Sequence, residues 1–239
     1  MKKSLLEICK QVAGELSFSV PPAVLSSSDV LTQQIRYLVQ NAAEELLLVH
    51  DWQALLKVGS ISLTGLTEYT LPDDVSRILP NSFNVSNSAS INLVGSTSPQ
   101  YFQKITTPNG VLNSVNQITF QVFGNKIKIY PATSGGTLTF IYVSTNFISN
   151  SAGTVSRASF QEDGDFPIFD SRLLTNLVKM KLLSTKGLDN SASTMDYNQL
   201  VDIVKAMDTP APILSLQQSS TPQPHTYTAI DNGSGIMYV

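Results

Sequence analysis

The spacing of apolar residues changes twice along this chain of 239 residues, and that double change limits its fold more than any other feature. At residues 5–16 and 35–49, apolar side chains recur every three or four positions, which is typical of amphipathic helices. After Leu56 the spacing becomes two, as in half-buried strands, and it returns to helical spacing from Phe169 onwards. The order of two helices, a block of strands and two further helices predicts an α+β protein.

Local signals mark the ends of the expected helices. Val20-Pro21-Pro22 ends the first helix, because proline cannot continue the backbone hydrogen-bond ladder. The polar run Ser26–Asp29 offers several N-caps for a second helix over about residues 30–52. Gly187 stops the third helix. The fourth helix has Tyr197, Leu200, Val201, Val204 and Met207 on one face, and Thr209-Pro210 breaks it.

All strand signals fall inside one block of roughly residues 58–148. The segment Phe123-Gly124-Asn125-Lys126 predicts a tight hairpin, because glycine and asparagine tolerate the positive φ that such turns require. Residues 99–104 are ambiguous, and a short helix there stays open. Strands are expected around Ile61-Ser62-Leu63 and Tyr69-Thr70-Leu71, and at Ser82–Val85, Ile91–Val94, Gln117–Phe123, Lys126–Tyr130 and Thr137–Val143.

The four helices can form one bundle only if the strand block is an insertion whose two ends lie close together. We therefore expect a four-helix-bundle-like α domain made of residues 1–57 and 160–209. An inserted antiparallel β domain, sandwich- or barrel-like, takes up residues 58–150. Residues 210–239 are rich in Ser, Gln, Pro and Thr, and they are expected to form an extended C-terminal tail because they cannot bury enough apolar surface alone.

Charge and cysteine content exclude several classes of protein. Only 14% of the residues are charged, compared with about 25% in typical soluble domains. Such a surface favours a protein enclosed by neighbours, although a secreted β-rich module would look similar. The net charge of −3 and the scattered basic residues argue against a nucleic-acid grip. Cys9, the only cysteine, rules out an internal disulfide and is expected to be buried and inert.

No apolar stretch approaches the roughly 20 residues that a membrane span needs, so we expect a soluble protein made and folded inside a cell.

His50 and Asp51 could suggest a catalytic base with its orienting carboxylate. Adjacent residues on a helix point in different directions, however, and the second histidine, His225, lies in the expected tail. We instead expect Trp52, Leu55 and Leu56 to close the base of the bundle as a structural helix–sheet joint. In that setting the indole N–H of Trp52 would need a hydrogen-bond partner.

Two acidic segments also fail as catalytic or metal sites. Glu162–Asp165 lacks the ligand spacing of a calcium-binding loop, and its position before Pro167 suits the start of a helix. Glu44-Glu45 lies on the polar side of a helix, where such pairs are more often solvated or at a subunit contact than catalytic. Phosphate-binding, dinucleotide-binding and nucleophile-elbow motifs do not occur in the sequence. We therefore expect no enzyme activity, no metal and no cofactor.

Several motifs, in the same order along the chain, resemble those of one protein family. The chain is similar to the head-to-tail adaptor (connector) proteins of short-tailed bacteriophages, the tail tubular protein A-like or tail accessory factor-like proteins, over about residues 3–208. The motifs that carry this resemblance are Asp51-Trp52-Gln53-Ala54-Leu55, residues 67–77 (TEYTLPDDVSR), Lys128–Ala132 followed by Gly136–Tyr142, Phe166-Pro167-Ile168 leading into Arg172-Leu173-Leu174, and Lys186–Asp189.

The resemblance implies a structural virion protein of the neck or tail, assembled in the host cytoplasm. Twelve copies would form a ring that joins the portal protein to the nozzle or other distal tail proteins. The ring would extend the DNA channel without binding DNA specifically. Family members send their C-terminal segment along the portal, which makes the apolar and aromatic residues of the tail candidate portal anchors. These anchors are Ile213, Leu214, Leu216, Tyr227, Ile230 and Tyr238.

Two other functions stay open. A β-rich virion module that recognises a host surface glycan or receptor would be favoured by exposed aromatic side chains at Tyr101 and Phe102. A peptidoglycan hydrolase is disfavoured, because the sequence lacks an acid–base constellation. Residues 80–108 also lack the aromatic and arginine residues associated with the resembling family, so this segment could serve a different tail partner.

Overall fold

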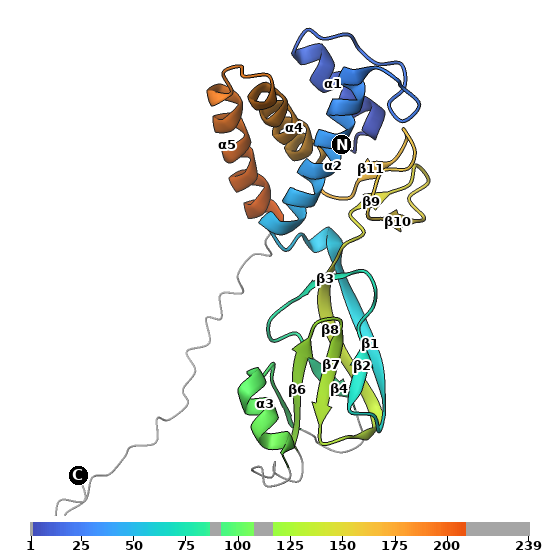
Figure 1. Cartoon of the computed structure of the whole chain (residues 1–239), viewed down its shortest axis with the longest axis vertical. Helices are drawn as coiled ribbons and strands as arrows, with labels where there is room; N and C mark the ends of the chain where they lie inside the picture. The colour runs from blue at the N-terminus through green and yellow to red at the C-terminus, as the bar shows by residue number, and fades with distance from the viewer. Residues whose placement is uncertain (1, 87–91, 108–116, 209–239) are drawn as a thin grey trace, which may run out of the picture. The chain divides into compact units, whose positions relative to one another are not determined.

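The computed structural model describes residues 2–86, 92–107 and 117–208, with helices at both ends of this span and strands between them (Figure 1). This order confirms the α+β class that the sequence predicts. Residues 1–209 form one compact unit, so the predicted boundaries between an α and a β domain stay a prediction. The predicted tail of residues 210–239 lies outside the described residues.

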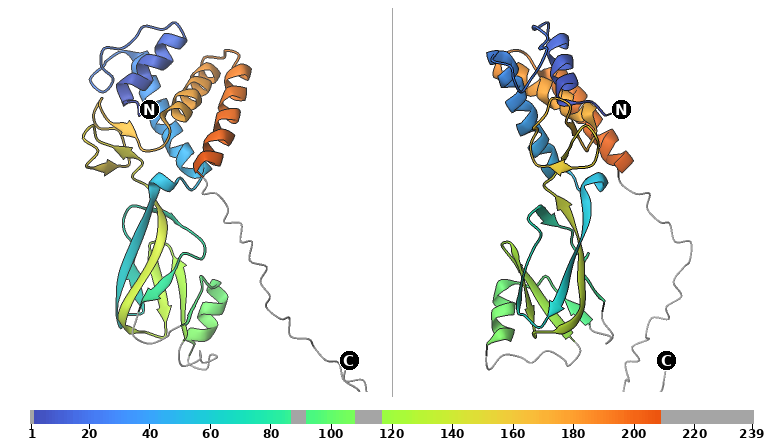
Figure 2. Two further views of the ribbon diagram at one scale, coloured as in Figure 1. Left: turned by 180° about the vertical axis from the view of Figure 1, so that it is seen from behind. Right: turned by 90° about the vertical axis from the view of Figure 1, so that its right-hand side faces the viewer.

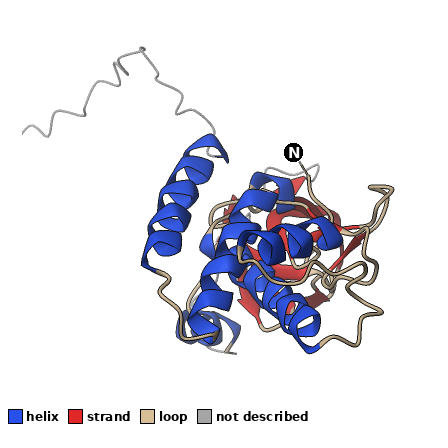
Figure 3. Cartoon of the chain, turned by 90° about the horizontal axis from the view of Figure 1, so that it is seen from above, coloured by secondary structure: helices blue, strands red, loops and turns tan. Residues whose placement is uncertain are grey.

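One central helix organises the helical part of the chain. α4 (Ser171–Thr185) packs against α1 (Leu5–Glu15), α2 (Val30–Val49) and α5 (Ser191–Asp208). In the view from above, these helices lie in front of the strands (Figure 3). The side chain of Asp29 caps α2 by accepting a hydrogen bond from the Thr32 N–H at 2.8 Å.

Two of the helix ends predicted from the sequence, those of α4 and α2, have different outcomes. Gly187 adopts a φ of +68° just after α4, as the predicted stop requires. The predicted end of α2 at residue 52 is wrong, because His50 is already extended and the helix ends at Val49.

Most strands belong to two open, four-stranded sheets. The first sheet has the order β1 (Leu56–Thr64), β8 (Ser134–Ser144), β3 (Val75–Ile78), with β4 (Asn84–Ser86) also paired to β8. The second has the order β2 (Glu68–Thr70), β7 (Lys126–Tyr130), β6 (Gln117–Phe123), β5 (Asn92–Val94). Neither sheet closes into a barrel among the described strands.

The expectation of a purely antiparallel β part is wrong for one pair, because β5 and β6 run parallel. A parallel pair requires a crossover, and the intervening chain contains α3 (Pro99–Thr106), which packs on β6. The ambiguous segment of residues 99–104 is therefore helical, with Ser98 as its N-cap. The predicted hairpin between β6 and β7 is confirmed, since Phe123 pairs with Lys126 and Gly124 has a φ of +57°.

A third, small sheet begins at the last residue of the predicted strand block and otherwise lies beyond it. It consists of β9 (Ile148–Ser149), β10 (Ser156–Arg157) and β11 (Phe166–Pro167), and strands of two residues are too short to produce a readable alternation. Ile148 and Phe160 of this region belong to the same buried cluster as the helices.

The described residues form two hydrophobic clusters, and β8 contributes to both. Leu138 and Phe140 are buried in the cluster between the strands, whereas Val143, near the end of β8, is buried among the helices. The chain therefore passes from one cluster to the other along β8. It also does so through the short 3₁₀ helix η1 (Gln53–Leu55), which connects α2 to β1.

Candidate functional site

Trp52 lies where the chain leaves α2 and enters η1. Its side chain is 2% exposed, and its Nε1–H donates to the Leu46 carbonyl at 2.7 Å. The ring contacts His50 edge-on, with a centroid distance of 4.9 Å, and it also packs against Phe169. Leu55 is buried in the same cluster, and Leu56 packs against it. The segment from His50 to Leu56, which connects α2 to β1 and is called the junction below, therefore contains all three residues that the sequence proposes as a joint. Their role as a joint stays a proposal.

His50 and Asp51 have different partners. Nε2 of His50 lies 3.2 Å from Oδ2 of Asp208, the last residue of α5. Asp208 also accepts a hydrogen bond from the backbone N–H of Gln53 at 2.9 Å, and its carbonyl accepts from the Gln53 amide. The end of α5 is thus fixed to the end of α2. A catalytic pair of His50 with Asp51 is not formed.

Arg77, from β3, completes the junction from the opposite side. Its guanidinium donates to Asp51 Oδ1 at 2.6 Å and to the carbonyls of Leu47 and His50, each at 2.9 Å. These carbonyls belong to the end of α2, where the helix has no intrahelical donors left for them. A positive charge there is also favoured by the helix dipole. Arg77 therefore acts as a C-terminal cap for α2 supplied from the strands.

Asp74 directly precedes β3, the strand that carries Arg77, and it binds three side chains. Its carboxylate accepts hydrogen bonds from Lys57 at 2.7 Å, Ser144 at 2.8 Å and Tyr142 at 2.9 Å. Burial alone would raise the pKa of Asp74, but Lys57, Ser144 and Tyr142 together hold the pKa below its usual value. Burial and the bond to Asp74 raise the pKa of Tyr142 to about 12.

The Asp74 cluster predicts a specific dependence of stability on pH. A lowered pKa in the folded state means that Asp74 contributes stability above the ordinary aspartate pKa of about 4, and that this contribution is lost as the pH falls through the folded pKa. Asp74→Asn should therefore be less stable at neutral pH, and it should lose less stability than the natural chain between about pH 5 and pH 2.

Urea denaturation at a series of pH values measures both effects, with the exposed neighbour Asp73→Asn as the matched control. Equal acid dependence in Asp74→Asn and in the natural chain would show that Asp74 is not a stabilising ion.

The acidic segment of residues 162–165 binds the beginning of α1 and the loop between α1 and α2, and it does not cap α4. Asp163 accepts hydrogen bonds from the backbone N–H groups of Val24 and Leu25 at 3.0 and 2.9 Å. The carbonyl of Asp165 accepts from Leu5 at 2.7 Å. Asp170 supplies the N-cap of α4 instead, so the predicted role of the acidic segment at that helix is wrong.

Cys9 is buried among the helices, as predicted. Burial, reinforced by the negative charge of Asp163, raises the pKa of the thiol to about 12. The thiol is therefore protonated and unreactive at neutral pH.

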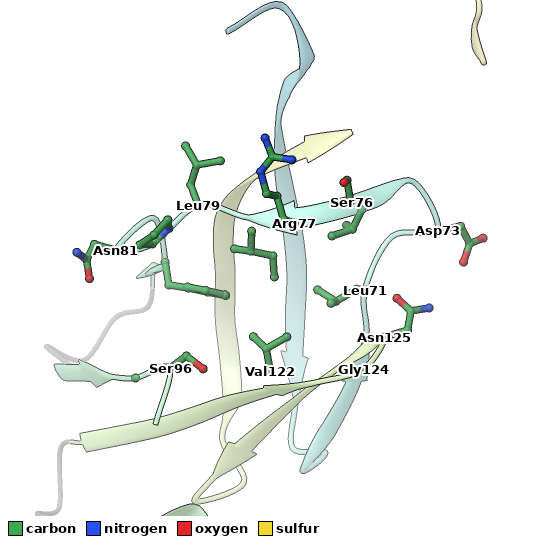
Figure 4. A pocket seen from close by; sticks show the side chains of 15 residues that line it. Leu71, Asp73, Ser76, Arg77, Leu79, Asn81, Ser96, Val122, Gly124 and Asn125 are labelled. Atoms are coloured by element: carbon green, nitrogen blue, oxygen red, sulfur yellow. The ribbon is translucent and has the colours of Figure 1, made fainter. Parts of the chain in front are cut away.

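A groove of about 850 Å³ lies between the two larger sheets. Leu71 and Val122 project between the sheets, and polar side chains surround them (Figure 4). The strand on one side, β3, pairs only with β8 among the described strands, so its other edge is open. Besides Arg77, the polar residues that line the groove are Asp73, Ser76, Asn81, Ser96 and Asn125. The lining includes one acidic residue, Asp73, and one basic residue, Arg77. The guanidinium of Arg77 is already hydrogen-bonded at the end of α2.

The remaining candidates separate into two groups. The six proposed portal anchors, residues 213–238, lie outside the described residues. Both aromatics that would favour a glycan-binding module belong to α3; Tyr101 is exposed, whereas Phe102 is buried. Only Tyr101 could therefore contribute to a glycan-binding surface.

Two further classes of site find no support in the described part of the chain. No helix there is long and apolar enough to cross a membrane. Within the same residues, no group of three or more His, Cys, Asp and Glu side chains is placed to hold a metal ion. The polar groups of the junction contact other segments of the chain.

Comparison with known proteins identifies the family. A family model described as SU10 adaptor protein matches residues 3–209, which is most of the chain. The chain therefore belongs to the SU10 adaptor protein family and is a phage adaptor protein. This agrees with the resemblance to phage adaptors found in the sequence. No curated protein matches the chain. Membership of a structural family implies that the protein is not an enzyme.

Proposed function

We propose that this protein is the head-to-tail adaptor of its phage, a virion protein of the neck that joins the portal protein to the nozzle or tail. The observation that carries the proposal is the family match over residues 3–209. An adaptor must bind other virion proteins, and the low content of charged residues suits a surface covered by neighbours. Twelve copies form a ring that extends the DNA channel, and the negative net charge lets DNA pass without a tight grip.

The junction around Trp52 has a mechanical role in this proposal. α1, α2, α4 and α5 act as one bundle, the strand part is inserted into it, and Trp52, Leu55 and Leu56 close the joint between them. Arg77 and Asp208 hold the joint from the strand side and from the α5 side. Forces transmitted between head and tail would therefore pass through a buried, hydrogen-bonded contact.

The tail that follows Asp208 supplies the portal contact in this proposal. Residues 210–239 carry apolar and aromatic side chains in a polar segment, a composition typical of segments that order on binding a partner. Ile213, Leu214 and Leu216 are the first anchors after α5, and Tyr227, Ile230 and Tyr238 follow.

Deletion of residues 210–239 tests this assignment. Residues 1–209 form a compact unit, so the shortened protein should remain folded, as far-UV circular dichroism would verify. Its affinity for the portal ring of the same phage should fall at least about tenfold, which corresponds to roughly 1.4 kcal/mol. Co-sedimentation with portal rings measures the change. A full-length variant with Ile213, Leu214 and Leu216 replaced by serine is the matched control. Undiminished binding of both variants would assign the portal contact to another part of the protein.

A further inference from the structure

The last residue of α5, Asp208, is held by the junction through both its side chain and its backbone. Its Oδ2 accepts a hydrogen bond from the backbone N–H of Gln53 at 2.9 Å and lies 3.2 Å from Nε2 of His50. The side-chain amide of Gln53 donates to the carbonyl of Asp208. His50, Gln53 and Asp208 are called the clamp below. In Figures 1 and 2 the end of α5 accordingly meets the end of α2.

Asp208 is unfavourable for its own helix, because a negative charge at a helix C-terminus opposes the helix dipole. Alanine at this position would also have a higher helix propensity. Residues that break a local rule are typical of functional positions, since their local cost is offset by a contact elsewhere. For Asp208 that contact is the clamp.

Apolar packing does not extend to the last turn of α5. Val204 is the last buried residue of the helix, and Met207, which the sequence places on the same face, is 76% exposed. A cavity of about 240 Å³ lies beside this turn, with Trp52, Phe169 and Asp208 in its lining. The position of the last turn therefore depends strongly on the polar contacts of the clamp.

The clamp also controls how the chain leaves the helix. The carbonyl of Asp208 belongs to the planar peptide unit that joins Asp208 to residue 209. Gln53 binds this carbonyl through its side-chain amide and the carboxylate through its backbone N–H. Both the side chain and the peptide plane of Asp208 are therefore fixed.

Two prolines follow the clamp, at positions 210 and 212. Each proline fixes its own φ and disfavours helical backbone in the residue before it. The sequence thus predicts a stiff spacer over residues 209–212, between the clamp and Ile213, the first candidate portal anchor. An orientation that is fixed at Asp208 would be passed along this spacer to the anchors.

We propose that the clamp positions the tail for binding to the portal protein. It is the fixed base from which the spacer presents Ile213, Leu214 and Leu216. This inference rests on the proposed function, in which the tail carries the portal contact. A segment that is already oriented loses less conformational freedom on binding, so the clamp raises the affinity without touching the portal. His50, Gln53 and Asp208 are therefore positioning residues.

A spin label at residue 209 tests the clamp in the free, full-length protein. Thr209→Cys supplies the attachment point, and the only natural cysteine, Cys9, is fully buried. The double substitution Gln53→Ala, Asp208→Ala removes the side-chain contacts of the clamp. Its electron paramagnetic resonance spectrum should be narrower than that of the labelled natural clamp, because the labelled residue gains rotational freedom.

The double variant Gln199→Ala, Asp202→Ala is the matched control. It changes the same residue types at exposed positions of α5 and should leave the spectrum of the label unchanged. Equal spectra for the clamp variant and the control variant would overturn the positioning role.

Co-sedimentation with portal rings of the same phage measures the consequence for binding. With the natural residue at position 209, Gln53→Ala, Asp208→Ala should raise the Kd about fivefold, which corresponds to roughly 1 kcal/mol of backbone entropy for one residue. In the chain shortened to residues 1–209 the same double substitution should have no effect, because the tail that the clamp positions is absent. An equal loss in the shortened chain would show that the clamp acts on the bundle instead, and it would refute the proposal.

Deletion of residues 210–239 separates this inference from the proposed function. If the deletion weakens binding and the clamp variant does not, the positioning role is refuted and the adaptor function stands. If neither change weakens binding, the tail does not carry the portal contact, and the positioning role fails with it.

Discussion

Trp52→Ala should lower the free energy of unfolding by about 3–5 kcal/mol, the cost of removing a large aromatic side chain from a packed core. Trp52 is 2% exposed and packs against His50 and Phe169, so neighbouring side chains cannot easily fill the cavity. Denaturation in urea, followed by far-UV circular dichroism, measures the loss. Tryptophan fluorescence cannot be used, because Trp52 is the only tryptophan.

Trp52→Phe provides the matched control. It keeps an aromatic ring in the core but removes the Nε1–H that donates to the Leu46 carbonyl. We expect an intermediate loss of about 1–3 kcal/mol, since one buried acceptor then lacks its donor. Unfolding of Trp52→Ala at the same urea concentration as the natural protein would show that the joint does not depend on this side chain.

Arg77→Met should lower the free energy of unfolding by about 2–4 kcal/mol. The substitution keeps an apolar stem but removes hydrogen bonds from a charged donor to two helix-end carbonyls and to Asp51, and such bonds contribute about 1.5–3 kcal/mol each in favourable cases. Hydrogen exchange should accelerate at the end of α2, because the cap that holds Leu47 and His50 is lost. Urea denaturation and amide exchange measure the two effects.

Asp51→Asn distinguishes capping from charge pairing. Asp51 is nearly half exposed, so the Arg77–Asp51 pair alone should contribute about 1 kcal/mol or less. Arg77→Lys should fall between the two variants, because an ammonium group cannot reach both carbonyls in the forked geometry of a guanidinium. An Asp51→Asn variant that loses as much stability as Arg77→Met would contradict the capping role.

Local features of the chain were predictable because short-range chemistry determines them. Gly124 and Asn125 predict the β6–β7 hairpin, since the turn depends on the φ of two adjacent residues. Asp29 and Gly187 likewise mark the ends of α2 and α4 through their own backbone and side-chain preferences. The strands β5 and β6 were both expected, but their parallel pairing was not predictable, because the apolar pattern of a strand does not give the direction of its neighbour. The third small sheet was not predictable, since strands of two residues carry too little pattern.

The junction was only half predictable for a different reason. Trp52 is conspicuous as a lone tryptophan after a helix, and its burial follows from its size and position. The partner of His50, by contrast, is Asp208, which lies at the far end of the described chain. Arg77 and Asp74 stand within the motif that resembles phage adaptors, but nothing in their neighbourhood along the sequence indicates that one caps α2 and the other binds Lys57 and Tyr142.

Electron microscopy of the full-length protein mixed with portal rings of its phage tests the central claim most directly. The adaptor function predicts portal particles capped by an additional ring of this protein, with a continuous axial channel and density for residues 210–239 along the portal. Portal particles that remain uncapped at protein concentrations well above micromolar would contradict the assignment. They would then leave the strand part, with its groove and its exposed Tyr101, as the surface to test against host glycans.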